Sequence, residues 1–204
     1  MTKLIGTGPN QVPTNADLGT MAYLDLEHAS TENQIVQYLR DSSYAHSIYS
    51  LTQNVEQDLP LSLSITPKYA NSRIMIRLHW NMSWKDTFSD CGFALRRDVN
   101  GSSTGYVQGS VRPDATRGRF TVGSHTRSPV WWIDDGPYDG VFSTISNSVL
   151  LMDDYSSTDP LTYTFTAGTG GTSRVLYWNQ ETHTGNSGTF AGGNCSIEAM
   201  EIRQ

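Results

Sequence analysis

The stretch RIMIRLHWNMSW, residues 73–84, alternates apolar and polar side chains with a period of two. One set of alternate positions is wholly apolar: Ile74, Ile76, Leu78, Trp80, Met82 and Trp84. Successive side chains of a strand point to opposite faces of a sheet, so the pattern predicts a long strand with one buried face. Trp80 and Trp84 are therefore predicted core residues. His79 lies on the polar face and is predicted to be a surface or interface histidine.

Further short apolar runs are separated by clusters of Gly, Asn, Asp and Ser, as expected for strands that alternate with turns. They are LSLSI at 61–65, GFALRRD at 92–98, RFTV at 119–122, PVWWI at 129–133, SVLLM at 148–152, LTYTFT at 161–166, RVLYW at 174–178 and SIEAMEI at 196–202. The composition agrees, because 18 Gly and 10 Tyr accompany a charged fraction of only 17%, whereas helical proteins favour Ala, Leu, Glu and Lys. We expect an all-β fold, an antiparallel β-sandwich or barrel.

The region before these strands differs in character. Residues 6–20, GTGPNQVPTNADLGT, combine Gly, Pro and Asn in a way that breaks both helix and strand. In residues 29–41, ASTENQIVQYLRD, Thr31 and Gln34 fit a capping box, and apolar residues follow at helical spacing. This pattern predicts one short amphipathic helix, whose apolar stripe must pack on the body or on copies of itself because so short a helix is unstable alone.

A chain of 204 residues has room for one sizeable core and a small appendage. We therefore divide it into an N-terminal segment with the short helix, residues 1–45, and a β-sandwich head, residues 46–204.

Two of the predicted strands are apolar on both faces. Residues 149–152 are uninterrupted apolar positions, and the last strand carries the set Ile197, Ala199, Met200 and Ile202. A solvated sheet face would not have this composition, so one face is expected to fill the core while the other meets a neighbouring subunit. These four residues of the last strand are the candidate subunit interface.

Charge excludes some partners and suggests another contact. The net charge is −6, which argues against nucleic acid because such binders carry a basic excess. No apolar run approaches the roughly 20 residues of a membrane span, and two cysteines exclude a disulfide scaffold.

Residues 96–127 are rich in Arg, whereas residues 128–173 contain Asp but no Lys or Arg. These stretches are interpreted either as surfaces that meet between copies or as two solvated loops.

Enzyme chemistry finds little support in the sequence. The tetrad GNSG at 185–188 is similar to a serine-protease nucleophile loop, but it lies among Thr, Gly and Asn residues without a recognisable histidine partner. The common catalytic, phosphate-binding and zinc motifs do not occur. Acidic clusters at 134–139 and 153–159 are typical of turns more than of calcium loops. We expect no enzyme activity, no cofactor and no metal.

A candidate ligand or receptor surface lies in the segment from residue 106 to residue 139. Flat aromatic rings beside carboxylates suit carbohydrate, although adjacent strand residues point to opposite faces, so one tryptophan of the pair is expected in the core. The candidate residues are Arg117, Arg119, Trp131, Trp132, Asp134 and Asp135.

Several motifs together support a resemblance. LIGTGPNQVPTNADLGTMAYLD at 4–25 resembles the entry motif of fibre-like structural proteins of marine phages, especially cyanophages. SLSITPKYANSRIMIRL, FALRRDVNGS, LLMDDYSSTDPLTYTFT and the closing SIEAMEI are similar to a C-terminal β-sandwich module of phage tail-fibre proteins. The segment 106–139 corresponds to nothing in that module, and the sequence predicts no long shaft.

The resemblance implies a homotrimeric, jelly-roll-like head in the manner of tumour-necrosis-factor heads, made in the host cytoplasm and displayed on the virion surface. The anchor to capsid or tail proteins would be formed by Ile5, Gly6, Pro9, Val12, Pro13, Leu18 and Met21. A short fibre, knob or capsid decoration that aids host adsorption fits best. The alternatives are a tail-fibre protein that recognises a host surface glycan and a glycan-degrading enzyme, which requires paired carboxylates.

Overall fold

The computed structural model describes residues 33–84, 89–107, 120–122, 125–127, 131–135, 141–169, 173–180 and 193–204, with side chains described outside 89–90 and 120–145. In these residues the chain is all β, and all the paired strands are antiparallel; one isolated bridge, between Gln53 and Thr169, is parallel. The strands are β1 (Ile35–Ser43), β2 (Ser47–Leu51), β3 (Gln57–Ile65), β4 (Arg73–Trp84), β5 (Ser89–Val99), β6 (Ser102–Tyr106), β7 (Phe120–Val122), β8 (His125–Arg127), β9 (Trp131–Asp135), β10 (Val141–Asp153), β11 (Leu161–Thr169), β12 (Arg174–Trp178) and β13 (Cys195–Ile202).

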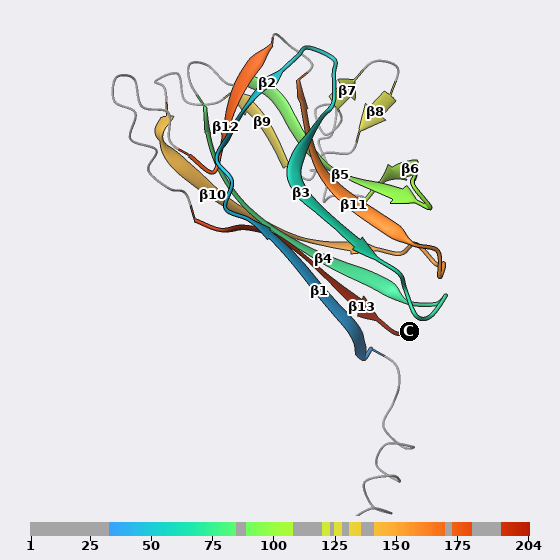
Figure 1. Cartoon of the computed structure of the whole chain (residues 1–204). Helices are drawn as coiled ribbons and strands as arrows, with labels where there is room; N and C mark the ends of the chain where they lie inside the picture. The colour runs from blue at the N-terminus through green and yellow to red at the C-terminus, as the bar shows by residue number, and fades with distance from the viewer. Residues whose placement is uncertain are drawn as a thin grey trace, which may run out of the picture.

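Two sheets face each other across the core (Figure 1). In the larger sheet β10 pairs with one edge of β4, while β13 and then β1 follow the first half of the other edge, and β12 and then β2 follow its second half. The smaller sheet has the order β3-β11-β5, and β5 carries β9 and β6 along successive halves of its free edge. β7 and β8 form a separate hairpin. The expected antiparallel, two-sheet architecture is confirmed.

The long strand predicted from its period of two is β4, with the predicted bounds and the predicted buried face. Its six apolar alternate residues, from Ile74 to Trp84, are all at most 2% exposed. Trp80 lies at the centre of an aromatic cluster, with ring centroids 4.9 Å from Phe165 and 6.5 Å from Phe93. Trp178 extends the cluster, 6.2 Å from Phe165. The core is therefore built from alternate residues of both sheets.

The helix predicted for residues 29–41 is wrong where the structure describes it, because residues 35–43 form β1. The ladder between β1 and β13 shifts register between Ile35 and Gln37, and a bulge of this kind adds one residue to a strand. Ile35 and Tyr38 therefore share a face despite being three residues apart, which reproduces the spacing of a helix. Backbone pairing with the edge of β13 supplies the hydrogen bonds that a helix would have made internally.

β1 is part of the larger sheet, although it precedes the boundary expected between residues 45 and 46. Its start is fixed by two backbone hydrogen bonds, from Asn33 N–H to the Arg203 carbonyl (2.6 Å) and from Arg203 N–H to the Gln34 carbonyl (3.0 Å). The seven anchor residues predicted between Ile5 and Met21 lie outside the described residues.

A polar junction lies at Asn81 of β4, between the part of β4 that pairs with β13 and the part that pairs with β12. Asn81 N–H donates to Cys195 Sγ at 3.3 Å, and the Asn81 carbonyl accepts from Asn179 N–H at 2.9 Å. The Ser146 hydroxyl donates to the Asn81 side chain. Burial raises the pKa of the Cys195 thiol to about 11. Cys195 and Cys91 are both buried and form no disulfide, so both cysteines are structural core residues.

The connection from β3 to β4 is held by one buried carboxylate. Glu201 Oε1 accepts hydrogen bonds from Lys68 N–H (2.8 Å), Tyr69 N–H (3.0 Å) and the Ser72 hydroxyl (2.7 Å). Glu201 comes from β13 and is fully buried. A fixed acceptor for three donors holds the turn against the end of the sheet.

Candidate functional site

The residues predicted as a ligand surface are only partly within the described structure. Arg117 and Arg119 lie outside the described residues. Trp131, Trp132, Asp134 and Asp135 all belong to β9, whose backbone runs antiparallel to β5, with Trp131 opposite Phe93 and Trp132 opposite Gly92. Their side chains are not described, so their role in binding stays a prediction.

The residues predicted as a trimer interface divide between the two faces of β13. Ile197 and Ala199 are 0% exposed and belong to the chain's own core, so their assignment to an interface is wrong. Met200 and Ile202 are half-buried and alternate with them. This strand is therefore apolar on both faces for two reasons: Ile197 and Ala199 fill the core, whereas Met200 and Ile202 lie on the outer side of the sheet.

Met200 and Ile202 belong to a larger apolar surface on the outer side of the larger sheet. Tyr38, Met200, Met75 and Met152 form a continuous cross-strand row over β1, β13, β4 and β10. We call this surface the outer apolar face; it consists of the exposed residues Ile35, Tyr38, Leu150 and Met152 and the half-buried residues Met75, Met200 and Ile202. The exposed residues Ile48 and Val175 lie on β2 and β12, near the other end of β4. Exposed apolar patches of this kind usually mark interfaces.

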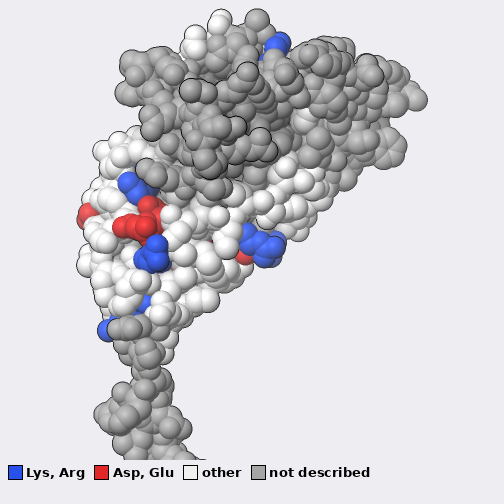
Figure 2. Space-filling view, turned by 180° about the vertical axis from the view of Figure 1, so that it is seen from behind, with Lys and Arg blue, Asp and Glu red and all other residues white. Residues whose placement is uncertain are grey.

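The outer side of the smaller sheet is polar by contrast. Hydroxyls form cross-strand hydrogen bonds between β3 and β11, Ser62 with Thr164 at 3.3 Å and Ser64 with Thr162 at 2.8 Å. Figure 2, which views the molecule from behind, shows charged side chains of the described residues in small patches of mixed sign on a largely uncharged surface. The outer side of the smaller sheet is therefore typical of a sheet face in contact with solvent, whereas the outer side of the larger sheet is not.

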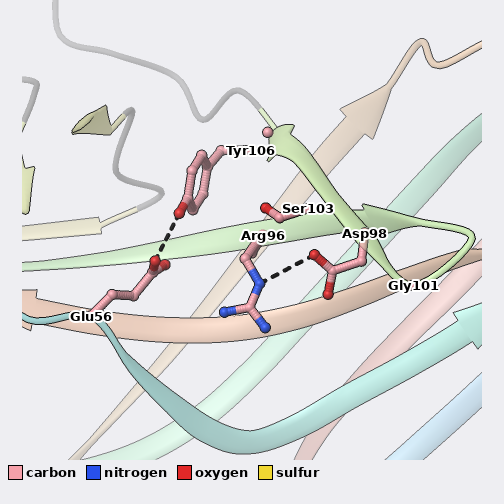
Figure 3. Close-up of a pocket in the computed structure, with 7 residues that line it drawn as sticks. Glu56, Arg96, Asp98, Gly101, Ser103 and Tyr106 are labelled. Carbon is pink, nitrogen blue, oxygen red and sulfur yellow. Dashed lines mark hydrogen bonds and ion pairs between the residues drawn. The ribbon is translucent and has the colours of Figure 1, made fainter. Parts of the chain in front are cut away.

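A pocket of about 630 Å³ opens on the polar side, between the β5–β6 hairpin and the start of β3. We call it the Arg96 pocket; it is lined by Glu56, Arg96, Asp98, Gly101, Ser103, Gly105 and Tyr106. Figure 3 shows the Tyr106 ring extending from β6 toward Glu56, beside Arg96. The Tyr106 hydroxyl donates to Glu56 Oε2 at 2.7 Å. Residues far apart in the sequence thus line one open, polar pocket.

Local backbone geometry places the β6 side chains in this pocket. Asn100 and Gly101 have φ values of 51° and 78°, which suit a two-residue hairpin turn of the Asn-Gly kind. The ladder then shifts register so that Ser103 lies opposite Asp98 while Gly105 lies opposite Arg97. This extra residue puts Ser103 and Tyr106 on one face although they are three positions apart. Gly105, with φ 138°, provides a backbone conformation that other residues rarely adopt.

Arg96 is held in place by two carboxylates. Its Nη1 and Nη2 donate to Asp58 at 2.6 and 3.1 Å, and its Nε donates to Asp98 at 3.3 Å. Because Asp58 is the second residue of β3 and Arg96 belongs to β5, the Arg96 side chain reaches across β11. The hydrogen bonds to Asp58 raise the pKa of the Arg96 guanidinium above its usual range. The guanidinium is therefore a fixed cation with its charge locally compensated.

A second network joins the two sheets beneath the hairpin. Arg97 Nη1 contacts Asp153 at 2.6 Å, and the Tyr163 hydroxyl donates to the other oxygen of Asp153 at 2.8 Å. The Arg97 guanidinium also lies 4.3 Å from the Tyr155 ring centroid. Burial, followed by the neighbouring Asp153 charge, raises the pKa of Tyr163, so its hydroxyl remains a donor. The Arg-rich and Asp-rich stretches thus meet here within one chain.

Sequence reasoning missed the Arg96 pocket. The Asn-Gly dipeptide at 100–101 was a readable signal for the β5–β6 hairpin, but nothing local in the sequence joins Glu56 to Tyr106. Asp153, in the acidic cluster that the sequence assigns to a turn, is the last residue of β10 and pairs with Arg97. Among the described residues, no group of three His, Cys, Asp or Glu side chains is arranged to hold a metal ion.

The described residues also contain no helix long and apolar enough to cross a membrane. No protein-family model and no curated protein matches the chain.

Proposed function

We propose that this chain is a non-enzymatic structural protein of a phage virion, a short trimeric knob or capsid decoration with a jelly-roll-like head. The observation that carries the proposal is the outer apolar face, because it extends over β1, β13, β4 and β10 on the outer side of the larger sheet, while the opposite side of the sandwich is polar. A second copy is the occupant that such a sheet face suits, since symmetric homo-oligomers are the commonest soluble assemblies.

The charged row beside the apolar row is consistent with contact between copies. Arg40 and Glu198 form an ion pair at 3.8 Å across β1 and β13, and Arg77 of β4 lies opposite Glu198. Alternating charges can fix the register of two copies, whereas the apolar residues supply the burial.

The mass of the purified protein in solution tests the assembly. We expect light scattering to give three times the 22.6 kDa chain mass, and Leu150→Asp to give the monomer mass. Leu150 is 60% exposed and lies opposite Arg77, so a carboxylate there has a cation beside it and the variant should fold. Val55→Asp, at a 50% exposed apolar residue outside this face, is the matched control and should remain trimeric.

The trimer should persist at about 1 M salt, because salt screens charges but not apolar burial. Dissociation by salt would move the interface to the charged stretches. A monomeric wild-type protein, or a trimeric Leu150→Asp variant, would contradict an interface on the outer apolar face.

Deletion of residues 1–28 tests the display on the virion. The deletion leaves all the described strands, including β1 at Ile35–Ser43, so the unfolding temperature is expected to stay unchanged while the protein no longer sediments with phage particles. Retention on the particles would contradict anchoring through the N-terminal segment, and loss of folding would contradict the division between anchor and head.

A further inference from the structure

We propose that the Arg96 pocket binds a neutral saccharide. Its polar groups include both hydrogen-bond acceptors and donors: the carboxylates of Glu56 and Asp98, the guanidinium of Arg96, and the hydroxyls of Ser103 and Tyr106. A sugar presents neighbouring hydroxyls, each of which donates and accepts. Carboxylates accept from such hydroxyls and a guanidinium donates to them, so the pocket matches a polyhydroxylated ligand.

The charge of the pocket excludes an acidic ligand. Two carboxylates and one guanidinium line it, and that guanidinium is already bound by Asp58 and Asp98. Three carboxylates, those of Glu56, Asp58 and Asp98, thus lie around one guanidinium. The negative charge would repel an anionic sugar, whereas a neutral sugar meets no repulsion.

The shape of the pocket suits a sugar ring. Nothing lies within 4 Å of the positions that a Cβ would take at Gly101 and Gly105, so the hairpin side of the pocket is low and open. Tyr106 offers an aromatic ring whose hydroxyl is fixed by Glu56 (Figure 3), and such a ring can cover the apolar side of a sugar. The volume of about 630 Å³ lies within the range of about 300–1,000 Å³ that ligand pockets occupy.

The site does not depend on the proposed trimer. Arg96 and Asp98 point from β5 to the polar outer side of the smaller sheet, where they lie opposite Thr164 and Thr162. The outer apolar face belongs to the other sheet, so assembly and saccharide binding can fail separately.

Saturation-transfer NMR on the full chain tests the proposal, with the methyl glycosides of glucose, galactose and N-acetylglucosamine and with N-acetylneuraminic acid as the acidic probe. We expect transfer to at least one neutral glycoside at concentrations up to about 20 mM, which would reveal a Kd near 1 mM, and none to the acidic probe. Ser103→Trp should weaken this binding at least tenfold because the indole fills the pocket.

Ser102→Trp is the matched control, since Ser102 neighbours Ser103 on the exposed strand β6 but does not line the pocket. It should bind within twofold of the wild type. Circular dichroism establishes that both variants are folded. Absence of transfer to every neutral glycoside, binding of the acidic probe alone, or equal affinity in the two variants would overturn the proposal.

Discussion

Replacing Asp153 by alanine is expected to lower the free energy of unfolding by about 3 to 5 kcal/mol, because the change leaves a buried charge without its partner. Asp153 is 5% exposed and is the shared acceptor of Arg97 and Tyr163. Its removal takes away the acceptor of both the Arg97 guanidinium and the Tyr163 hydroxyl, at the point where β10 of one sheet meets β5 and β11 of the other. Urea unfolding at fixed protein concentration measures the effect.

The neighbouring residue supplies the control for this experiment. Asp154 pairs with Arg73, but both side chains are well exposed, at 67% and 42%. An ion pair in water is worth about 0 to 1 kcal/mol, so Asp154→Ala should change the unfolding free energy by no more than that. The double variant Asp153→Leu with Arg97→Met should lose less stability than Asp153→Ala, because it removes both charges. Equal effects of Asp153→Ala and Asp154→Ala would refute the structural role of the Arg97–Asp153 pair.

Trp80→Ala is expected to cost about 3 to 5 kcal/mol, the usual range for removing a buried aromatic side chain. Trp80 is 1% exposed and packs against Phe93 and Phe165, which come from the opposite sheet. The substitution therefore opens a cavity between the sheets and removes two aromatic contacts. The same urea titration gives the loss as a lower midpoint, with an unchanged slope if the folded state is otherwise retained.

Tyr44→Ala is the comparison for the aromatic substitution. Tyr44 is 69% exposed, and surface substitutions of this kind usually change stability by about 0.5 kcal/mol or less. A Trp80→Ala protein as stable as Tyr44→Ala would show that the aromatic cluster does not form the core.

Many of the strands were predictable because a strand with one buried face alternates apolar and polar residues along the sequence. β4 and β12 have the bounds that their runs predict, and β3, β5, β10, β11 and β13 each contain the predicted run within a longer strand. β2, β6 and β8 were not predicted. β6 has the sequence SSTGY, which carries no alternation, and its pairing depends on the turn and bulge that attach it to β5.

Sequence alone determined the all-β class and the buried face of β4, because alternation with a period of two is a local property of the chain. Tertiary structure decided β1, since a bulged strand and a short helix place the same residues on one face, and only the edge of β13 distinguishes them. It also decided which apolar faces remain exposed, because Ile197 and Met200 look alike in sequence and differ only in what covers them. The Arg96 pocket and the Arg97–Asp153 pair depend on contacts between distant segments, so no local pattern could have revealed them.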